Sequence, residues 1–199
     1  MVIGSSGRPS TSLYFYVLLF FLSSSYFIYG FYQHEVDPEE YAISKSLRVD
    51  ANSLAFFNFV TQTHIMEKIL PWLTRIKEAD LRTLTSGKFY HAHSKIIIGT
   101  EKIHLMVVEY QVGKHLILQS EDQFIRQRIE IRTKRYHNQT IFTIKVYSKR
   151  TSALFHHTVG RAVQNFIIKQ LETSLIHTAE IYIAISNELK IPKLITSKE

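Results

Sequence analysis

The fold is decided by residues 128–147, which read RIEIRTKRYHNQTIFTIKVY. Apolar and β-branched side chains recur at every second position on both sides of His137-Asn138; they are Ile129, Ile131 and Thr133 before that dipeptide and Phe142, Ile144 and Val146 after it. A period of two is typical of a strand with one buried face. Asn at the break favours a tight turn. The stretch therefore predicts an antiparallel hairpin with one face on a core.

The same period extends over residues 73–150, which predicts a meander of roughly six short strands. Turn residues separate the strands at Ser86-Gly87, Gly99-Thr100, Val112-Gly113-Lys114, Glu121-Asp122 and His137-Asn138. A further strand precedes them, because Tyr41, Ile43, Leu47 and Val49 alternate with small or polar residues. Between that strand and the meander, Asp50 is expected to cap one short helix, and a second short helix ends at Pro71.

The chain closes with a long apolar periodicity of three to four residues, from about Thr158 to Leu189. A helix of about thirty residues is some 45 Å long, so it needs a broad apolar surface to cover. The order of elements therefore predicts an α+β fold, in which a curved antiparallel sheet of about seven strands wraps on the long C-terminal helix.

The N-terminal segment differs from the rest of the chain. Residues 13–32 carry no charge, and about twenty residues of helix match the thickness of a bilayer core. Tyr and Phe side chains lie at both ends of the segment, as in an aromatic belt. We expect a transmembrane anchor at 13–32 after a tail at 1–12, then a linker at 33–40, the folded domain at 41–189 and a tail at 190–199. A cleaved signal peptide and a mitochondrial presequence are the alternatives.

Flanking charge predicts the orientation of this segment. Arg8 precedes it, while residues 35–40 include four acidic side chains, Glu35, Asp37, Glu39 and Glu40. The positive-inside rule then favours a cytosolic N-terminus and a domain on the luminal side. We expect a single-pass membrane protein of the secretory pathway or endoplasmic reticulum, with a secreted or mitochondrial protein as the alternatives.

The composition limits the possible functions. The chain has 199 residues, 24 Lys and Arg against 17 Asp and Glu, and a net charge of +7. It has no Cys, which excludes disulfides, thiolate metal sites and a cysteine nucleophile. The length suits one core rather than two.

The order strand, two helices, six strands and long helix resembles the helix-grip fold of the START-like, or SRPBCC, superfamily. That superfamily includes polyketide cyclases, coenzyme Q-binding proteins, lipid-transfer proteins and the birch-pollen allergen family. The resemblance covers about residues 41–186. Val49-Asp50-Ala51 resembles the family's turn into the helices, and Ile69-Leu70-Pro71-Trp72 resembles its passage out of them. GTEKIHLMVVEY at 99–110, followed by Gly113-Lys114-His115-Leu116, resembles its central hairpin.

The resemblance implies an apolar cavity between sheet and helix that holds a lipid, sterol or quinone. We expect the ligand to contact Trp72, His104, Met106, Phe142, Ile144, Phe166 and Gln170. A filled core is the competing interpretation, because 13 Phe and 11 Tyr can occupy the same volume.

Candidate catalytic and metal-binding residues are few. His91, His93 and His104 share a predicted sheet face, but no acidic fourth ligand is evident. Glu109-Tyr110 lacks a second carboxylate, and Ser152 with His156 lacks the third member of a triad. We expect no enzyme activity, no metal and no cofactor.

Positive charge gathers on the hairpin predicted at 126–150, where Glu130 is the only acidic residue. Its basic residues are Arg126, Arg128, Arg132, Lys134, Arg135, Lys145, Lys149 and Arg150. We expect Arg128, Arg132, Lys134 and Arg135 to contact an anionic membrane or a protein partner. A solvated charge ladder is the alternative. Nucleic acid is not expected, because few aromatic side chains accompany the charges.

Two functions follow from these observations. The first is a membrane-tethered START-like domain that binds, and could transfer, a hydrophobic small molecule or lipid. The second is a non-catalytic structural or assembly factor with a filled core, which docks an unknown protein partner through the basic hairpin.

Asn138-Gln139-Thr140 is an N-glycosylation sequence in the predicted turn of this hairpin, so it tests the orientation. If the domain is luminal, endoglycosidase treatment of the full chain expressed in cells will increase its gel mobility. The Asn138→Gln variant should run at the treated position with or without the enzyme. No shift in the unsubstituted chain would contradict a glycosylated luminal hairpin.

Overall fold

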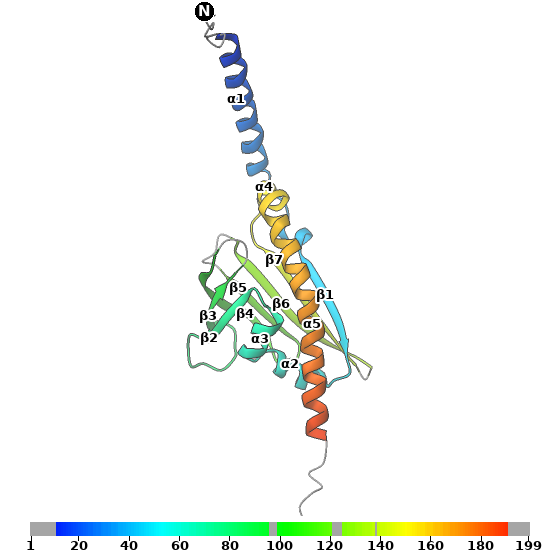
Figure 1. The fold of residues 1–199 in the computed structure, drawn as a ribbon. Helices are drawn as coiled ribbons and strands as arrows, with labels where there is room; N and C mark the ends of the chain where they lie inside the picture. Colours follow the sequence, from blue (N-terminus) through cyan, green and yellow to red (C-terminus); the bar gives the residue numbers. More distant parts are fainter. Residues whose placement is uncertain (1–10, 96–98, 121–124, 138, 191–199) are drawn as a thin grey trace, which may run out of the picture.

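A computed structural model of the 199-residue chain describes residues 11–95, 99–120, 125–137 and 139–190 (Figure 1). The helices are α1 (Thr11–Gln33), a 3₁₀ turn η1 (Pro38–Tyr41), α2 (Ser53–Val60), α3 (Thr63–Ile69), α4 (Ala153–Phe155), a π turn η2 (His156–Gly160) and α5 (Arg161–Lys190). The strands are β1 (Ile43–Val49), β2 (Leu73–Glu78), β3 (Phe89–Ser94), β4 (Glu101–Gln111), β5 (His115–Ser120), β6 (Gln127–Tyr136) and β7 (Gln139–Ser148).

The strands form one antiparallel sheet of seven, in the order β1-β7-β6-β5-β4-β3-β2. Strands that follow one another from β2 to β7 are neighbours, and β1 pairs with β7. The decisive hairpin is β6–β7, in which Ile131 lies opposite Ile144 and Thr133 opposite Phe142. Since the side chains of both strands alternate in phase, their apolar members share the concave face. The predicted fold class is confirmed.

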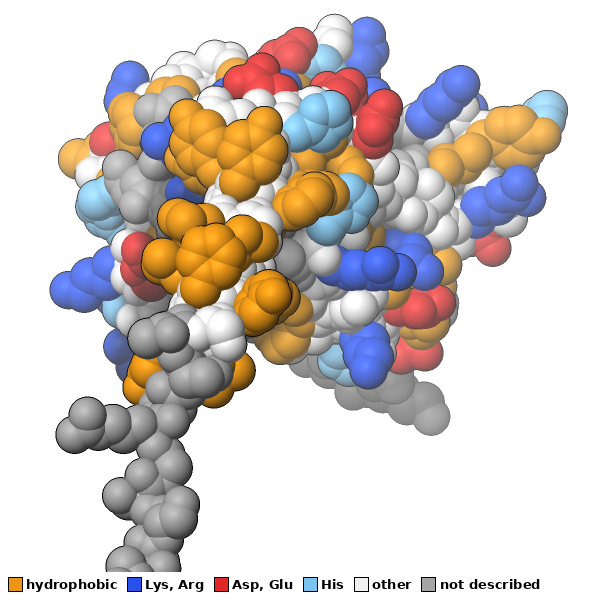
Figure 2. Space-filling model, turned by 90° about the horizontal axis from the view of Figure 1, so that it is seen from above, with side chains coloured by type: hydrophobic (Ala, Val, Ile, Leu, Met, Phe, Trp, Pro, Cys, Tyr) orange, Lys and Arg blue, Asp and Glu red, His pale blue; other side chains and the backbone are white. Residues whose placement is uncertain are grey.

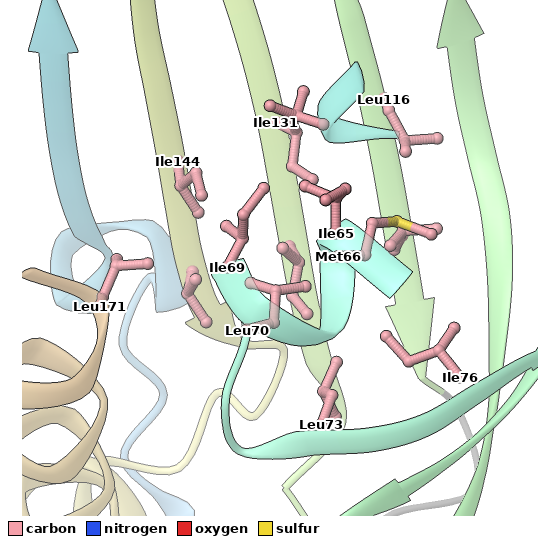
Figure 3. Close-up of a cluster of buried hydrophobic side chains, with 14 of the residues drawn as sticks. Ile65, Met66, Ile69, Leu70, Leu73, Ile76, Leu116, Ile131, Ile144 and Leu171 are labelled. Carbon is pink, nitrogen blue, oxygen red and sulfur yellow. The ribbon is translucent and has the colours of Figure 1, made fainter. Parts of the chain in front are cut away.

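Three helices, α2, α3 and α5, cover the concave face of the sheet. Helix α5 lies along the side of β1, where Gln164 Nε2 donates to the Tyr41 carbonyl at 2.5 Å and Lys45 pairs with Glu172 at 3.6 Å. Helices α2 and α3 fill the middle, and Figure 3 shows side chains of α3 directed onto strands of the sheet. Four side chains of this helix region are at most 3% exposed; they are Ile65, Met66, Ile69 and Leu70.

The cap of α2 differs from the prediction. Asn52, rather than Asp50, is the N-cap, and its Oδ1 accepts from the N–H groups of Leu54 and Ala55 at 3.0 and 3.2 Å. Asp50 instead accepts from Gln139 Nε2 at 2.7 Å. The helix therefore begins later than expected, and Asp50 ties the start of α2 to the β6–β7 hairpin.

Helix α1 extends away from the domain (Figure 1), and residues 12–33 are long and apolar enough to cross a membrane, with a mean hydropathy of 1.5. Its end is joined to the segment after β7. The Val36 N–H donates to the Thr151 carbonyl at 2.7 Å, and the Ala153 N–H donates to the His34 carbonyl at 2.8 Å. The domain therefore has one end close to α1 and an opposite end, which holds the tip of the β6–β7 hairpin. The predicted glycosylation residue, Asn138, lies outside the described residues.

Packing of α3 against the sheet predicts the cost of truncating its side chains. Leu70→Ala should lower the free energy of unfolding by about 2–5 kcal/mol, because Leu70 is fully buried. Leu81→Ala is the matched control, since Leu81 is fully exposed, and it should change this free energy by less than about 0.5 kcal/mol. Urea unfolding of the full chain in mild detergent, followed by Trp72 fluorescence, measures both. Equal stability of the two variants would contradict the packing described.

Candidate functional site

The space between the sheet and α5 is largely filled by side chains. Trp72, Leu73 and Ile144 are fully buried, and Phe142 is 1% exposed. Phe56, from α2, contacts both Phe142 and Tyr182 edge to face, with ring centroids 5.2 and 5.0 Å apart, so it joins the sheet to α5. The space between the sheet and α5 is thus packed as a hydrophobic core over most of its length.

A small cavity lies between the sheet and the beginning of α5. Its volume is about 20 Å³, which is enough for a water molecule and far less than a lipid needs. Its walls include Ile43, Gln127, Val146, Val163 and Ile167. The π turn η2 forms another part of the wall, through His156 and Gly160. Single π turns inside helices are frequent at functional sites.

The residues predicted to bind a ligand fall into two groups. Trp72, Phe142 and Ile144 are buried in the core, and Phe166 is half-buried against it. Gln170 is half-buried as well, and its Oε1 is buried without a hydrogen-bond partner among the described residues.

His104 and Met106 do not lie with this group. On β4 the buried residues are Ile103, Leu105 and Val107, so the residues between them face the opposite side of the sheet. His104 is exposed there and contacts the His91 ring, with centroids 4.9 Å apart. The expectation that His104 and Met106 line the space between sheet and helix is therefore wrong. Among the described residues, no group of three or more His, Cys, Asp or Glu side chains could hold a metal ion.

Buried polar groups lie beside the small cavity. The indole Nε1–H of Trp72 donates to Gln127 Oε1 at 3.3 Å, and both residues are at most 1% exposed. Gln127 Nε2 has no hydrogen-bond partner among the described residues, and neither has the Oγ of Ser120, which is also 1% exposed. An unsatisfied polar atom in a core costs about 1–3 kcal/mol. Two such atoms, Gln127 Nε2 and Ser120 Oγ, lie close together at the end of the sheet near α1. This end of the space between sheet and helices therefore differs from the rest, which is packed with apolar side chains.

A surface pocket of about 530 Å³ adjoins these groups. It is lined by Gln119, Ser120, Arg126 and Lys149. The Lys149 N–H donates to the Arg126 carbonyl at 2.9 Å, which holds the two basic residues side by side, one directly after β7 and the other directly before β6. The pocket lies where β5 ends and β6 begins, next to the segment that joins β7 to α4. It is therefore at the end of the domain that is close to α1.

The basic residues predicted to make contacts are divided by the structure. Arg128 and Arg132 both pair with Glu130, at 3.4 and 2.7 Å, and Glu130 is 3% exposed. Burial raises the pKa of Tyr147 to about 12, so its hydroxyl remains protonated and donates to Glu130 at 3.4 Å. These charges stabilise the outer face of the sheet.

Lys134 and Arg135 are exposed and lie toward the tip of the β6–β7 hairpin, far from α1. Figure 2, viewed from the α1 side, shows Lys and Arg side chains interspersed with Asp and Glu rather than gathered in one patch. Lys134 and Arg135 are therefore poorly placed to contact a bilayer that contains α1.

Ser120, Gln127, Arg126 and Lys149 were not predicted as ligand contacts. A signal for two of them was present, because Gln127 and Ser120 occupy inward positions at which the alternation of β6 and β5 calls for apolar residues. Their proximity depends on the register between β5 and β6, which the alternation within either strand does not fix.

No protein-family model matches the chain, and no curated protein matches it. Solved structures do. A protein from Thermus thermophilus aligns with a TM-score of 0.54 at 14% identity, covering 73% of this chain and 99% of its own. A START superfamily protein from Mycobacterium smegmatis aligns with a TM-score of 0.53 at 11% identity, covering 71% of this chain and 98% of its own. A protein from Deinococcus radiodurans aligns with a TM-score of 0.51 at 10% identity, covering 70% of this chain and 95% of its own. The chain therefore has the helix-grip fold of the START-like superfamily, as the sequence resemblance implied.

Proposed function

We propose that this protein is a membrane-tethered domain that binds a hydrophobic small molecule or lipid and exchanges it with the bilayer, without covalent chemistry. The observation that supports this most is the position of the small cavity. It lies between the sheet and the beginning of α5, at the end of the domain from which α1 leaves. An apolar molecule leaving a bilayer would meet this end first.

Binding of a lipid requires the cavity to enlarge. Pockets for such ligands measure about 300–1,000 Å³, so side chains at the beginning of α5 must move outward. The irregular helix there favours this movement. A Cβ added at Gly160 would lie 2.9 Å from the Phe155 carbonyl, so the π turn requires glycine at this position. The more regular part of α5, including Leu171 and Leu175, remains packed on the core.

Helix α1 would serve as the tether. Its side chains from residue 12 to 33 are almost all exposed and available to lipid. Within the described chain, only its C-terminal end touches the domain, where the Ser152 Oγ donates to the Tyr32 carbonyl at 3.2 Å. The luminal orientation and the secretory compartment remain predictions from flanking charge.

The carrier function predicts that a bulky residue in the cavity blocks loading. Val163→Trp places a large ring where Val163, which is 5% exposed, lines the cavity. Ile176→Trp is the matched control on the same helix, because Ile176 is 51% exposed. After purification in mild detergent and organic extraction, the Val163→Trp chain should yield at least about ten-fold less bound ligand than the control.

The comparison of Val163→Trp with Ile176→Trp also corrects for lipids that bind outside the cavity. Lipids retained around α1 are common to both variants, so only the difference between them reports on the interior. Equal amounts of the same lipids on the unsubstituted chain and both variants would show that the interior holds no ligand.

The packed core favours a second function. With a cavity of only about 20 Å³ among the described residues, the domain could act with its interior filled, as an assembly factor that docks a protein partner. The exposed Lys134 and Arg135 would then face the partner, at the end of the domain far from α1.

The docking function predicts the opposite response to substitution. Lys134→Glu combined with Arg135→Glu should abolish cross-links between the hairpin tip and a neighbouring protein in intact cells, because like charges then face each other. Val163→Trp should leave these cross-links unchanged. Cross-linking mass spectrometry measures both, and cross-links that persist after charge reversal would contradict docking through the tip.

A further inference from the structure

We propose that the surface pocket formed by Gln119, Ser120, Arg126 and Lys149 binds the phosphate group of an anionic lipid. The inference rests on the proposed carrier function and specifies the polar end of its ligand. Two basic side chains and a buried hydroxyl line this pocket, which measures about 530 Å³.

Strand pairing brings the members of the site together. Leu118 on β5 lies opposite Ile129 on β6, so Ser120 and Gln127 occupy the next inward positions of the same two strands. Gln127 lies opposite Ser148 on β7, and the backbone bond from Lys149 to Arg126 continues that ladder by one position. Ser120 at the end of β5, Arg126 and Gln127 at the start of β6 and Lys149 directly after β7 thus lie at one end of the sheet.

Arg126 has an unusual backbone conformation. Its φ is +48°, in the left-handed region that non-glycine residues seldom occupy. Conformations of this kind cluster at ligand sites, where the surrounding structure holds them in place. Here the turn of the backbone separates Arg126 from the regular alternation of β6 and directs it to the pocket that Lys149 also lines.

The unpartnered buried atoms define the ligand's chemistry. Because Gln127 Oε1 already accepts from Trp72, the free end of the amide is Nε2, which can only donate. Ser120 Oγ can donate as well. With the guanidinium of Arg126 and the ammonium of Lys149, the site presents donors and positive charge, and its complement is an oxyanion with several acceptor oxygens. A phosphate group meets this need.

The position of Gln127 connects the site to the interior. Gln127 lines the small cavity together with Val163 and Ile167, while its neighbour Ser120 lines the surface pocket. A phosphate held outside by Arg126 and Lys149 would therefore direct an attached hydrocarbon chain past Gln127 toward the beginning of α5. This geometry suits a phospholipid with a small headgroup, in which no bulky alcohol covers the phosphate.

Titration of the full chain in phosphatidylcholine nanodiscs tests the proposal. The probes are dihexanoyl phosphatidic acid, dihexanoyl phosphatidylcholine and inorganic phosphate, and the readout is the fluorescence of Trp72, the single Trp of the sequence. Phosphatidic acid should bind most tightly. Arg126→Gln combined with Lys149→Gln should weaken its binding about ten-fold or more. Arg161→Gln combined with Lys169→Gln, an exposed pair of the same charge on α5, should leave binding unchanged.

Ser120 separates a binding role from a structural one. Ser120→Ala should weaken phosphatidic acid binding about five-fold and raise the Tm of the lipid-free chain, because an unpartnered buried hydroxyl is removed. Ser148→Ala is the control: its Oγ donates to the Ile125 carbonyl, so its loss should lower the Tm. A lower Tm for Ser120→Ala would show that its hydroxyl has a structural partner and would overturn its assigned role.

The remaining outcomes distinguish this proposal from the carrier function. Equal binding of phosphatidic acid and phosphatidylcholine, or binding that survives Arg126→Gln with Lys149→Gln, would overturn the phosphate site and leave carriage of a neutral ligand intact. Inorganic phosphate that binds as tightly as phosphatidic acid would support an anion site and refute the lipid as its source. In the Val163→Trp variant, phosphatidic acid should bind no more tightly than inorganic phosphate, because its hydrocarbon chains can no longer enter the cavity. That result would support both the phosphate site and the carrier function.

Discussion

The register between β6 and β7 is the constraint on which the rest of the structure depends. A slip of β6 by one residue against β7 would turn Ile129 and Ile131 to solvent while the facing Ile144 stayed inward, because side chains alternate along a strand. The same register places Gln127 inward and Arg126 beside Lys149. Formation of the core and placement of the candidate phosphate site are therefore consequences of one pairing, and neither can change without the other.

Ligand binding in this fold has to compete with side-chain packing. Helices α2 and α3 occupy much of the concave face, and their burial contributes to the stability of the ligand-free domain. A ligand gains the hydrophobic free energy of its own apolar surface but must displace contacts at the beginning of α5. The loss is smallest where packing is already incomplete, which is beside the π turn and the unpartnered polar atoms. Opening the structure at the beginning of α5 therefore costs less free energy than opening it elsewhere between the sheet and the helices.

Much of the architecture could be predicted from the sequence, since periods of two and of three to four residues report directly on strands and helices. The misplaced His104 and Met106 show an error of phase: Ile103, Leu105 and Val107 already identify the inward face of β4. The pairing of Arg128 and Arg132 with Glu130 was missed although it is local, because residues two apart on β6 share one face of the sheet. The proximity of Ser120 to Gln127 could not be predicted, because it depends on the register between β5 and β6, which the alternation within either strand does not fix.

The attachment of α1 determines how far the domain can travel. Residues 34–42 between α1 and β1 would span about 30 Å if fully extended, but the pairing of Glu35 with Ser152 and the 3₁₀ turn at Pro38–Tyr41 shorten and stiffen this segment. If the domain is the proposed carrier and α1 its tether, so short a connection limits it to a single bilayer and prevents it from reaching an opposing one. Any molecule it withdraws must be handed to a recipient that comes to it, so the reach of the pathway would be set by that recipient's geometry.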